Sequence, residues 1–190
     1  MGDMSDPRDV REALLDSAYD AAVGGDWDRV RMADVATVAN VSRQTLYNEF
    51  GSKEGLAQAL SMREAERFLA VVEDATKTGV GPGQAIELTV LESLTSAGQN
   101  PLIKAALTGA HSSELLRLLT ASENLIHLAD DRLAAGLLER FPHLDPEIVA
   151  EVSDVVVRLT ISHLVTPDGP AETVARRIQR LVTPLLEVRA

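Results

Sequence analysis

Apolar residues recur every three or four positions along nearly the whole chain, whereas stretches of alternating apolar and polar residues are scarce. This period is that of an α-helix that buries one face. Alanine and leucine dominate, and aromatic residues, which favour strands, make up only 3% of the 190 residues. The sequence therefore predicts an all-α protein with one or two domains.

Glycine and proline divide this pattern into a series of expected helices. The first begins at Asp6-Pro7, an aspartate cap before a proline at the first helical position, and ends at Gly24-Gly25. Pro184 should kink or shorten the last helix. Further helices are expected over residues 32–38, 43–50, 53–76, 83–97, 101–108, 112–120, 122–140, 146–165 and 171–188. We expect two domains, a three-helix head (1–53) and a larger helical body (54–190).

Charge is distributed unevenly along the chain. The 18 basic and 29 acidic residues give a formal net charge of −11, which by itself argues against a nucleic-acid partner. Residues 29–53 are the exception, because they hold four basic and two acidic residues. The segments before and after them carry net charges of −6 and −7. The head therefore contains the one locally positive stretch of the sequence.

Several classes of protein are disfavoured by what the sequence lacks. It has no cysteine, which rules out disulfides, thiolate metal sites and cysteine nucleophiles. No stretch approaches the ~20 apolar residues that cross a membrane, and the N-terminus has no secretory pattern. The four histidines lie 16, 16 and 20 residues apart, which is not the spacing of metal ligands on a helix. We expect a cytoplasmic protein with no metal, cofactor or membrane partner, and no catalytic motif marks an enzyme.

Residues 32–50 have the dimensions of a helix-turn-helix, whose second helix enters the major groove of DNA. Asn40 lies in the short turn, where a residue that tolerates positive φ is needed. Ser42 is placed to cap the second helix, and Ala36 is small where the two helices approach. Two surface helices joined by a turn would show the same spacing, so spacing alone does not decide between these interpretations.

The exposed positions of the second helix carry side chains suited to DNA. Arginine, glutamine and asparagine read base edges, whereas serine, threonine and tyrosine hydroxyls reach phosphates. The candidates are Arg43, Gln44, Thr45, Tyr47 and Asn48.

This region resembles the DNA-binding head of the TetR family of bacterial transcriptional repressors. The resemblance covers about residues 10–60 and rests on a dense pattern: Asp34-Val35-Ala36, Val41-Ser42, Thr45-Leu46-Tyr47, Phe50 and Ser52-Lys53-Glu54-Gly55-Leu56. It implies that Tyr47 and Lys53 hold phosphates and that Ser42 caps the recognition helix and touches the DNA backbone. The residues that it implies to face bases are Arg43, Gln44, Thr45 and Asn48.

Three positions depart from the family pattern. Asn40 stands where glycine is usual, and the turn tolerates it. Arg31 stands near the start of the first helix of the motif, where threonine or serine is usual, so a charge contact with a phosphate would replace a hydroxyl contact. Glu49 stands where histidine is common, and its negative charge either lowers the affinity for DNA or faces away from it.

The last two expected helices carry more apolar surface than one neighbour within the chain would cover. This surface and the family resemblance favour a homodimer, in which two copies form a four-helix bundle across a two-fold axis. Packing within one chain is the alternative. The interface is expected at Val156, Leu159, His163, Ile178, Leu181 and Leu185.

The central body is rich in leucine and alanine, and the resemblance implies that part of it lines a pocket for a small ligand. Because aromatic residues are few, an aliphatic or acyl-type ligand fits the composition better than a flat aromatic one. The expected pocket residues are Leu91, Leu107, His111, Asn124 and His127, although an ordinary core or surface role is commoner for such residues.

We therefore expect a homodimeric, ligand-responsive regulator that represses transcription from a palindromic operator in double-stranded DNA. A small apolar or acyl-type ligand would release it, and the long helix from residue 53 would carry the signal. One alternative is a helical small-molecule or lipid-binding protein, or an enzyme, whose head does not bind DNA. Another is a head that docks onto a protein.

Overall fold

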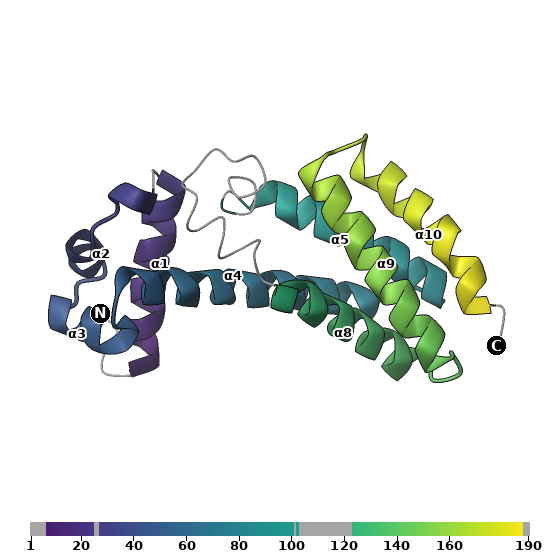
Figure 1. Cartoon of the computed structure of the whole chain (residues 1–190), viewed down its shortest axis with the longest axis horizontal. Coiled ribbons are helices and arrows are strands. Elements are labelled where there is room, and N and C mark those ends of the chain that lie inside the picture. The colour runs from purple at the N-terminus through teal and green to yellow at the C-terminus, as the bar shows by residue number, and fades with distance from the viewer. Residues whose placement is uncertain (1–6, 25–26, 101, 103–122, 188–190) are drawn as a thin grey trace.

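The computed structural model describes residues 7–24, 27–100, 102 and 123–187, and within these residues the chain forms eight α-helices, one 3-10 helix and no strand (Figure 1). The expectation of an all-α protein is confirmed. The elements are α1 (Pro7–Gly24), η1 (Trp27–Arg29), α2 (Met32–Val38), α3 (Arg43–Phe50), α4 (Lys53–Thr76), α5 (Pro82–Gln99), α8 (Glu123–Arg140), α9 (Pro146–Val165) and α10 (Ala171–Glu187). The expected helices over residues 101–108 and 112–120 lie outside the described residues.

Local capping places most helix ends where the sequence predicts them. The carboxylate of Asp145 accepts the N–H groups of Glu147 and Ile148 at 2.9 and 3.5 Å, which satisfies the free end of α9. Of the two effects expected of Pro184, shortening is not seen, because α10 continues to Glu187, and a kink stays a prediction. Packing of the final turn on the body explains this continuation, since a helix in a protein is held mainly by its buried face.

Two separate apolar cores lie at opposite ends of α4 (Figure 1). The head core is built by α1, η1, α2, α3 and the first turns of α4, and it includes Trp27, which is only 1% exposed. The body core is built mainly by α5, α8, α9 and α10, and α4 also packs on α5 and α8. A domain boundary after residue 53 stays a prediction. The helix α4 begins at residue 53 and runs through this boundary, and its apolar residues up to Leu60 belong to the head core.

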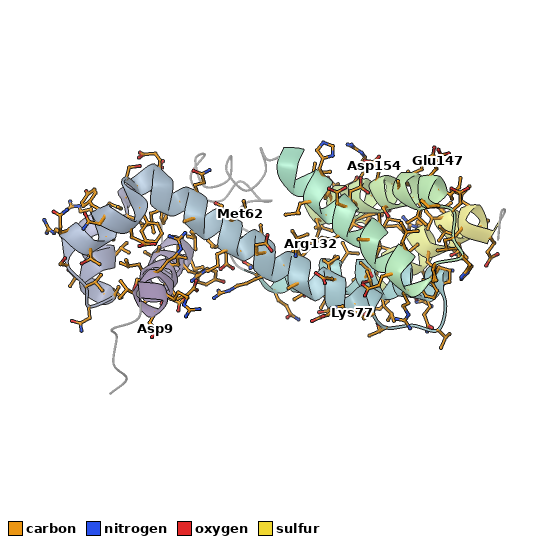
Figure 2. All side chains as sticks on the ribbon, turned by 90° about the horizontal axis from the view of Figure 1, so that it is seen from below. Asp9, Met62, Lys77, Arg132, Glu147 and Asp154 are labelled. Atoms are coloured by element: carbon orange, nitrogen blue, oxygen red, sulfur yellow. The ribbon has the colours of Figure 1, made fainter. Side chains whose placement is uncertain are left out.

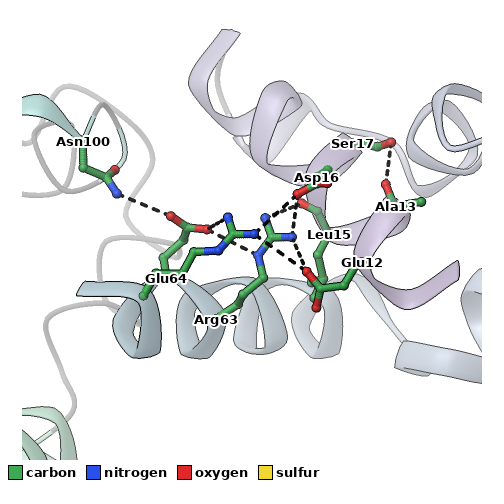
Figure 3. Close-up of polar contacts among 9 residues, drawn as sticks. Glu12, Ala13, Leu15, Asp16, Ser17, Arg63, Glu64 and Asn100 are labelled. Carbon is green, nitrogen blue, oxygen red and sulfur yellow. Dashed lines mark hydrogen bonds and ion pairs between the residues drawn. The ribbon is translucent and has the colours of Figure 1, made fainter. Parts of the chain in front are cut away.

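Arg63 of α4 ties the head to the long helix through charges and a backbone carbonyl of α1 (Figure 3). Its Nη1 lies 2.8 Å from Asp16 Oδ1 and 3.2 Å from Glu12 Oε2, and its Nη2 donates to the carbonyl of Leu15 at 3.1 Å. The Arg63 side chain is only 9% exposed. This partly buried, multiply bonded arginine fixes α1 against α4 more firmly than an isolated surface pair would.

The end of α5 reaches the same junction. Glu64, which is 4% exposed, pairs with Arg67 at 3.1 Å and accepts the Asn100 amide at 3.4 Å (Figure 3). Asn100 also accepts the N–H of Leu102 at 2.9 Å, and Leu102 is 3% exposed within the head core. The body therefore contacts the head at this point as well as through α4. At the same junction, burial and the nearby Glu64 raise the pKa of Tyr19 on α1.

Two arginines of α8 hold the body on the far half of α4. Arg132 Nη2 lies 2.6 Å from Glu66 Oε2, and Figure 2 shows Arg132 beside α4. Arg140 donates to the carbonyls of Thr76, Thr78 and Gly79, which lie at and just beyond the C-terminus of α4. A guanidinium at this position satisfies carbonyls that the helix leaves unpaired.

None of the described helices is long and apolar enough to span a membrane.

Gly55 sets the angle between α3 and α4, because a Cβ at this position would lie well inside contact distance of the Phe50 carbonyl oxygen. We expect Gly55→Ala to lower the free energy of unfolding by about 2 kcal/mol, since the end of α3 must move away. Gly98→Ala is the control: Gly98 lies in α5, and a Cβ added there would meet nothing within 4 Å, so this change should be neutral or slightly stabilising. Chemical denaturation measures both, and equal stabilities would contradict the close approach.

Candidate DNA interface

A tight turn joins α2 to α3. Asn40 has a φ of +57°, which confirms the need for a residue that tolerates the left-handed region. The N–H of Val41 donates to the Ala36 carbonyl at 3.0 Å, and the N–H of Asn40 donates to the Thr37 carbonyl at 3.1 Å. These bonds close the end of α2. Ala36 and Leu46, 2% and 0% exposed, belong to the head core and hold both helices on it.

Ser42 caps α3, as the sequence predicts. Its Oγ accepts the N–H of Thr45 at 3.0 Å and lies 2.8 Å from Thr45 Oγ1. Two polar side chains therefore mark the N-terminus of α3, where the helix dipole favours an anion. Arg43, the first residue of the helix, is exposed beside them.

The outward side of α3 is polar along its length. Gln44 Nε2 donates to Asn48 Oδ1 at 2.8 Å, and both side chains are exposed. This bond leaves the Gln44 carbonyl oxygen as an acceptor and the Asn48 amide as a donor. Tyr47 is 47% exposed and lies one turn after Arg43. We call this set the recognition surface: Ser42, Arg43, Gln44, Thr45, Tyr47 and Asn48.

Two cations flank the recognition surface in different surroundings. Arg31 is exposed just before α2, and its side chain does not cap that helix. Lys53, at the start of α4, donates to the Asp28 carbonyl at 3.0 Å and lies 5.5 Å from the centre of the Trp27 ring. An ammonium has three N–H donors. Lys53 can therefore keep its hydrogen bond to the Asp28 carbonyl and donate to a phosphate at the same time.

Glu49 does not stand alone at the edge of α3. Its Oε1 lies 2.6 Å from Arg11 Nη1 of α1, and the Arg11 guanidinium lies 4.9 Å from the centre of the Phe50 ring. The carboxylate therefore faces α1, one of the two outcomes left open by the sequence. Sequence reasoning missed Arg11, because no local pattern connects residues 38 positions apart.

The predicted ligand-pocket residues are described only in part. Leu91 is half-buried against the body core, and His127 is exposed on α8. Leu107, His111 and the side chain of Asn124 lie outside the described residues. A pocket shared by these residues stays a prediction. In the described part of the chain, no group of three His, Asp or Glu residues could hold a metal ion.

One carboxyl group between α8 and α9 has a perturbed pKa. Burial raises the pKa of Asp130, and repulsion from Asp154 and Asp131 raises it further, while His127 and Arg158 act in the opposite direction. Asp130 Oδ1 has no hydrogen-bond partner among the described residues. Because its pKa is higher in the folded than in the unfolded chain, the charged form opposes folding at neutral pH. That cost disappears as the pH falls below the unfolded value.

The predicted dimer-interface residues differ in how far their own chain covers them, and an interface at these residues stays a prediction. Val156 and Ile178 are 2% and 1% exposed and belong to the body core, so they pack α9 and α10 on their own chain and leave no surface for a second copy. Leu181 and Leu185 of α10 are 63% and 52% exposed. These two leucines remain available to a partner.

The outer side of α9 is also apolar. Leu159 and His163 are half-buried, and Val155 and Val165 are 43% and 53% exposed. The monomer therefore covers one side of α9 and leaves part of another uncovered. Sequence periodicity detected both apolar sides but could not say which of them the chain itself covers.

Two family models match the chain. Residues 14–60 match "Bacterial regulatory proteins, tetR family", and residues 82–184 match "Bacterial Tetracyclin repressor, C-terminal domain". The first match spans most of α1 and the whole recognition surface, and the second spans α5 to α10. Together they cover the parts that build the two cores.

Similar proteins are regulators of transcription. The chain is 33% identical to the HTH-type transcriptional regulator AlkX of Mycobacterium tuberculosis, over 94% of this chain and 85% of that protein. It is 29% identical to the HTH-type transcriptional repressor KstR of Mycolicibacterium smegmatis, over 94% of this chain and 88% of that protein.

Solved structures share the fold over the full length. The TetR family repressor AlkX from Dietzia sp., implicated in biodegradation of n-alkanes, superposes with a TM-score of 0.72 at 28% identity, over 98% of each chain. FadR from Bacillus subtilis, in complex with stearoyl-CoA, superposes with a TM-score of 0.62 at 15% identity, over 90% of this chain and 96% of that one. The head geometry, both family models and these relatives agree, and the chain belongs to the TetR family of bacterial transcriptional regulators.

Proposed function

We propose that this chain is a homodimeric, non-enzymatic repressor that acts in the cytoplasm, binds a palindromic operator through α3 and leaves it when a small aliphatic or acyl-type ligand binds the body. The recognition surface carries the proposal: six polar side chains lie along one short capped helix, outside the head core. A module that packs this helix against a protein partner would be expected to present apolar side chains there.

Residue roles follow from the chemistry of each side chain. Gln44 and Asn48 together present an acceptor and a donor, the pair of groups that complements the N6 and N7 edge of adenine. Arg43 suits the N7 and O6 acceptors of guanine, and Thr45 completes the base-facing set. The side chains proposed for phosphates are Arg31, Ser42, Tyr47 and Lys53.

The exposed apolar residues of α9 and α10 support a two-fold dimer. Val155, Val165, Leu181 and Leu185 leave these helices with uncovered apolar area that a second copy would bury. Two copies related by a two-fold axis would place their α3 helices in successive major grooves, roughly 34–36 Å apart. This arrangement requires an inverted repeat in the operator.

An aliphatic ligand fits the body better than an aromatic one. The body core is formed by valine, leucine, isoleucine and alanine, and Phe141 is its only buried aromatic residue among those described. A relative from Dietzia sp. is implicated in biodegradation of n-alkanes, which favours a saturated chain. Relatives named KstR are repressors, which favours repression over activation. The alternative of a lipid carrier or enzyme with an inactive head gains no support from these relatives.

A ligand controls DNA binding only to the extent that it binds one head arrangement better than the other. Two connections could carry this difference from body to head. One is α4, which is continuous from Lys53 to Thr76. The other is the end of α5, where Asn100 bonds Glu64 and Leu102 enters the head core.

Selection of bound duplexes from a random DNA pool should enrich an inverted repeat.

Arg43→Ala should then weaken operator binding by roughly 10- to 100-fold and relax the preference at one base pair. Tyr47→Ala should weaken binding to all sequences, because it removes a phosphate contact. Lys77→Ala is the control: it breaks an exposed ion pair with Asp74 just after α4, outside the head and outside α9 and α10, and should bind like wild type. No enrichment with a folded, ligand-free dimer would contradict the proposal.

Paired Leu181→Glu and Leu185→Glu substitutions should produce monomers, because they place charges in the proposed interface. Sedimentation equilibrium measures the mass. Val80→Glu is the matched control, since Val80 is 97% exposed and lies outside α9 and α10. A doubly substituted protein that remains a dimer would place the interface elsewhere.

Stearoyl-CoA and free stearate should release labelled operator from the wild-type protein, measured by fluorescence anisotropy. Leu102→Ala should still bind operator but need at least about tenfold more probe, because the head core loses its contact with the end of α5. Leu144→Ala removes a leucine of similar burial far from the junction and is the control. Release of Leu102→Ala at the wild-type concentration would reject this connection, and failure of both probes on wild type would reject the proposed ligand class.

A further inference from the structure

Glu49 is the only acidic residue of α3, and it borders the recognition surface. It lies one turn after Thr45, one of the proposed base-facing residues, and so on the same side of α3. Arg11 holds that carboxylate from α1 at 2.6 Å, and the two side chains are 42% and 35% exposed. The pair therefore sits on the surface, within reach of the electrostatic field of bound DNA.

Arg11 is positioned from two sides. Its guanidinium bonds Glu49 and also lies 4.9 Å from the centre of the Phe50 ring, at the end of α3. An arginine over an aromatic face is attracted to the ring and loses rotational freedom. Both contacts keep the cation beside α3 instead of free in solvent.

Lys53, the other cation beside the recognition surface, has a different kind of partner. It bonds a neutral backbone carbonyl, so its full positive charge remains for a phosphate. Arg11 bonds a carboxylate, so the charge of the pair is close to zero when seen from DNA. Screening in physiological salt extends over about 8 Å, so charges at the edge of α3 are felt by the backbone of a bound duplex.

We propose that Arg11 and Glu49 form a charge-masking pair that lowers the sequence-independent affinity for DNA, an inference that rests on the proposed DNA-binding function. Glu49 keeps the Arg11 guanidinium from binding phosphates of any sequence. Arg11 cancels the negative charge that Glu49 would otherwise bring to the recognition helix. Sequence-independent affinity comes from phosphate contacts that release counterions, so masking one cation lowers binding to random DNA. The pair thereby lowers the affinity for DNA of any sequence, operator included, because a phosphate contact carries no sequence information.

The test compares Arg11→Gln, Glu49→Gln and the double variant on the selected operator and on a random duplex of equal length. Glu49→Gln should bind random DNA about tenfold more tightly, and the magnitude of its salt slope should rise by about 1, because one more cation reaches a phosphate. Its affinity for the operator should rise by a similar factor, because the added phosphate contact does not depend on sequence. Arg11→Gln should weaken binding to both duplexes about equally, since an unpaired carboxylate repels both. The double variant should return close to wild type.

Controls separate this role from a structural one. Thermal unfolding midpoints of all three variants should stay near wild type, because the pair is exposed. Lys77→Gln breaks an exposed ion pair just after α4, where Lys77 Nζ lies 2.9 Å from Asp74 Oδ1, outside the head and the proposed dimer interface, and should change neither affinity nor salt slope.

Two results would overturn the proposal. One is Glu49→Gln with wild-type affinity and salt slope on random DNA. The other is a salt slope that falls by about 1 in Arg11→Gln alone, which would mean that Arg11 already contacts a phosphate in the complex. A wild-type protein that selects no sequence at all would instead reject the proposed function, and the charge-masking pair with it.

Discussion

A single helix is shared by both apolar cores, and it fixes the distance between head and body. The 24 residues of α4 extend about 36 Å at 1.5 Å per residue. Its first turns supply Leu56 and Leu60 to the head core, and its later turns pack on α5 and α8. Because its backbone is hydrogen-bonded throughout, such a helix moves mainly as a unit, so a displacement in the body cannot remain confined to the body. The relative position of the two cores is therefore the variable that a ligand would have to change.

Charged groups at the middle of α4 decide how the head sits on this helix. Arg63 and Glu64 are adjacent in sequence and pair with each other at 3.3 Å, and each has a further partner: Arg63 bonds α1, and Glu64 bonds Asn100 at the end of α5. A carboxylate as buried as Glu64 is costly unless it is paired, and loss of one partner exposes that cost. The junction therefore favours one geometry over a loose range of geometries. Leu102 adds an apolar contact of the body to the head core at the same place.

Charge also explains how an acidic protein can carry a DNA-binding surface. The net charge of −11 comes from the segments on either side of residues 29–53, whereas α3 exposes polar and basic side chains and holds its single carboxylate against Arg11. Local potential, not total charge, governs an approaching phosphate once screening limits the range to about 8 Å. Lys53 and Arg11 therefore differ in the local potential that they create. The carbonyl bonded to Lys53 does not neutralise its charge, whereas the Glu49 carboxylate cancels the charge of Arg11.

Local sequence was enough to specify the described helices, the turn at Asn40, the caps at Ser42 and Asp145, and the polar outer side of α3. All of these depend on residues within about four positions of each other, where geometry follows directly from the local backbone. Folding of the whole chain was needed to pair Arg11 with Glu49, 38 positions away, and Arg63 with Asp16, 47 positions away. Folding of the whole chain also decided which side of α10 turns inward: Ile178 is covered by its own chain, and Leu181 and Leu185 are not. An apolar face shows that a helix must be covered, but its partner is set by the path of the whole chain.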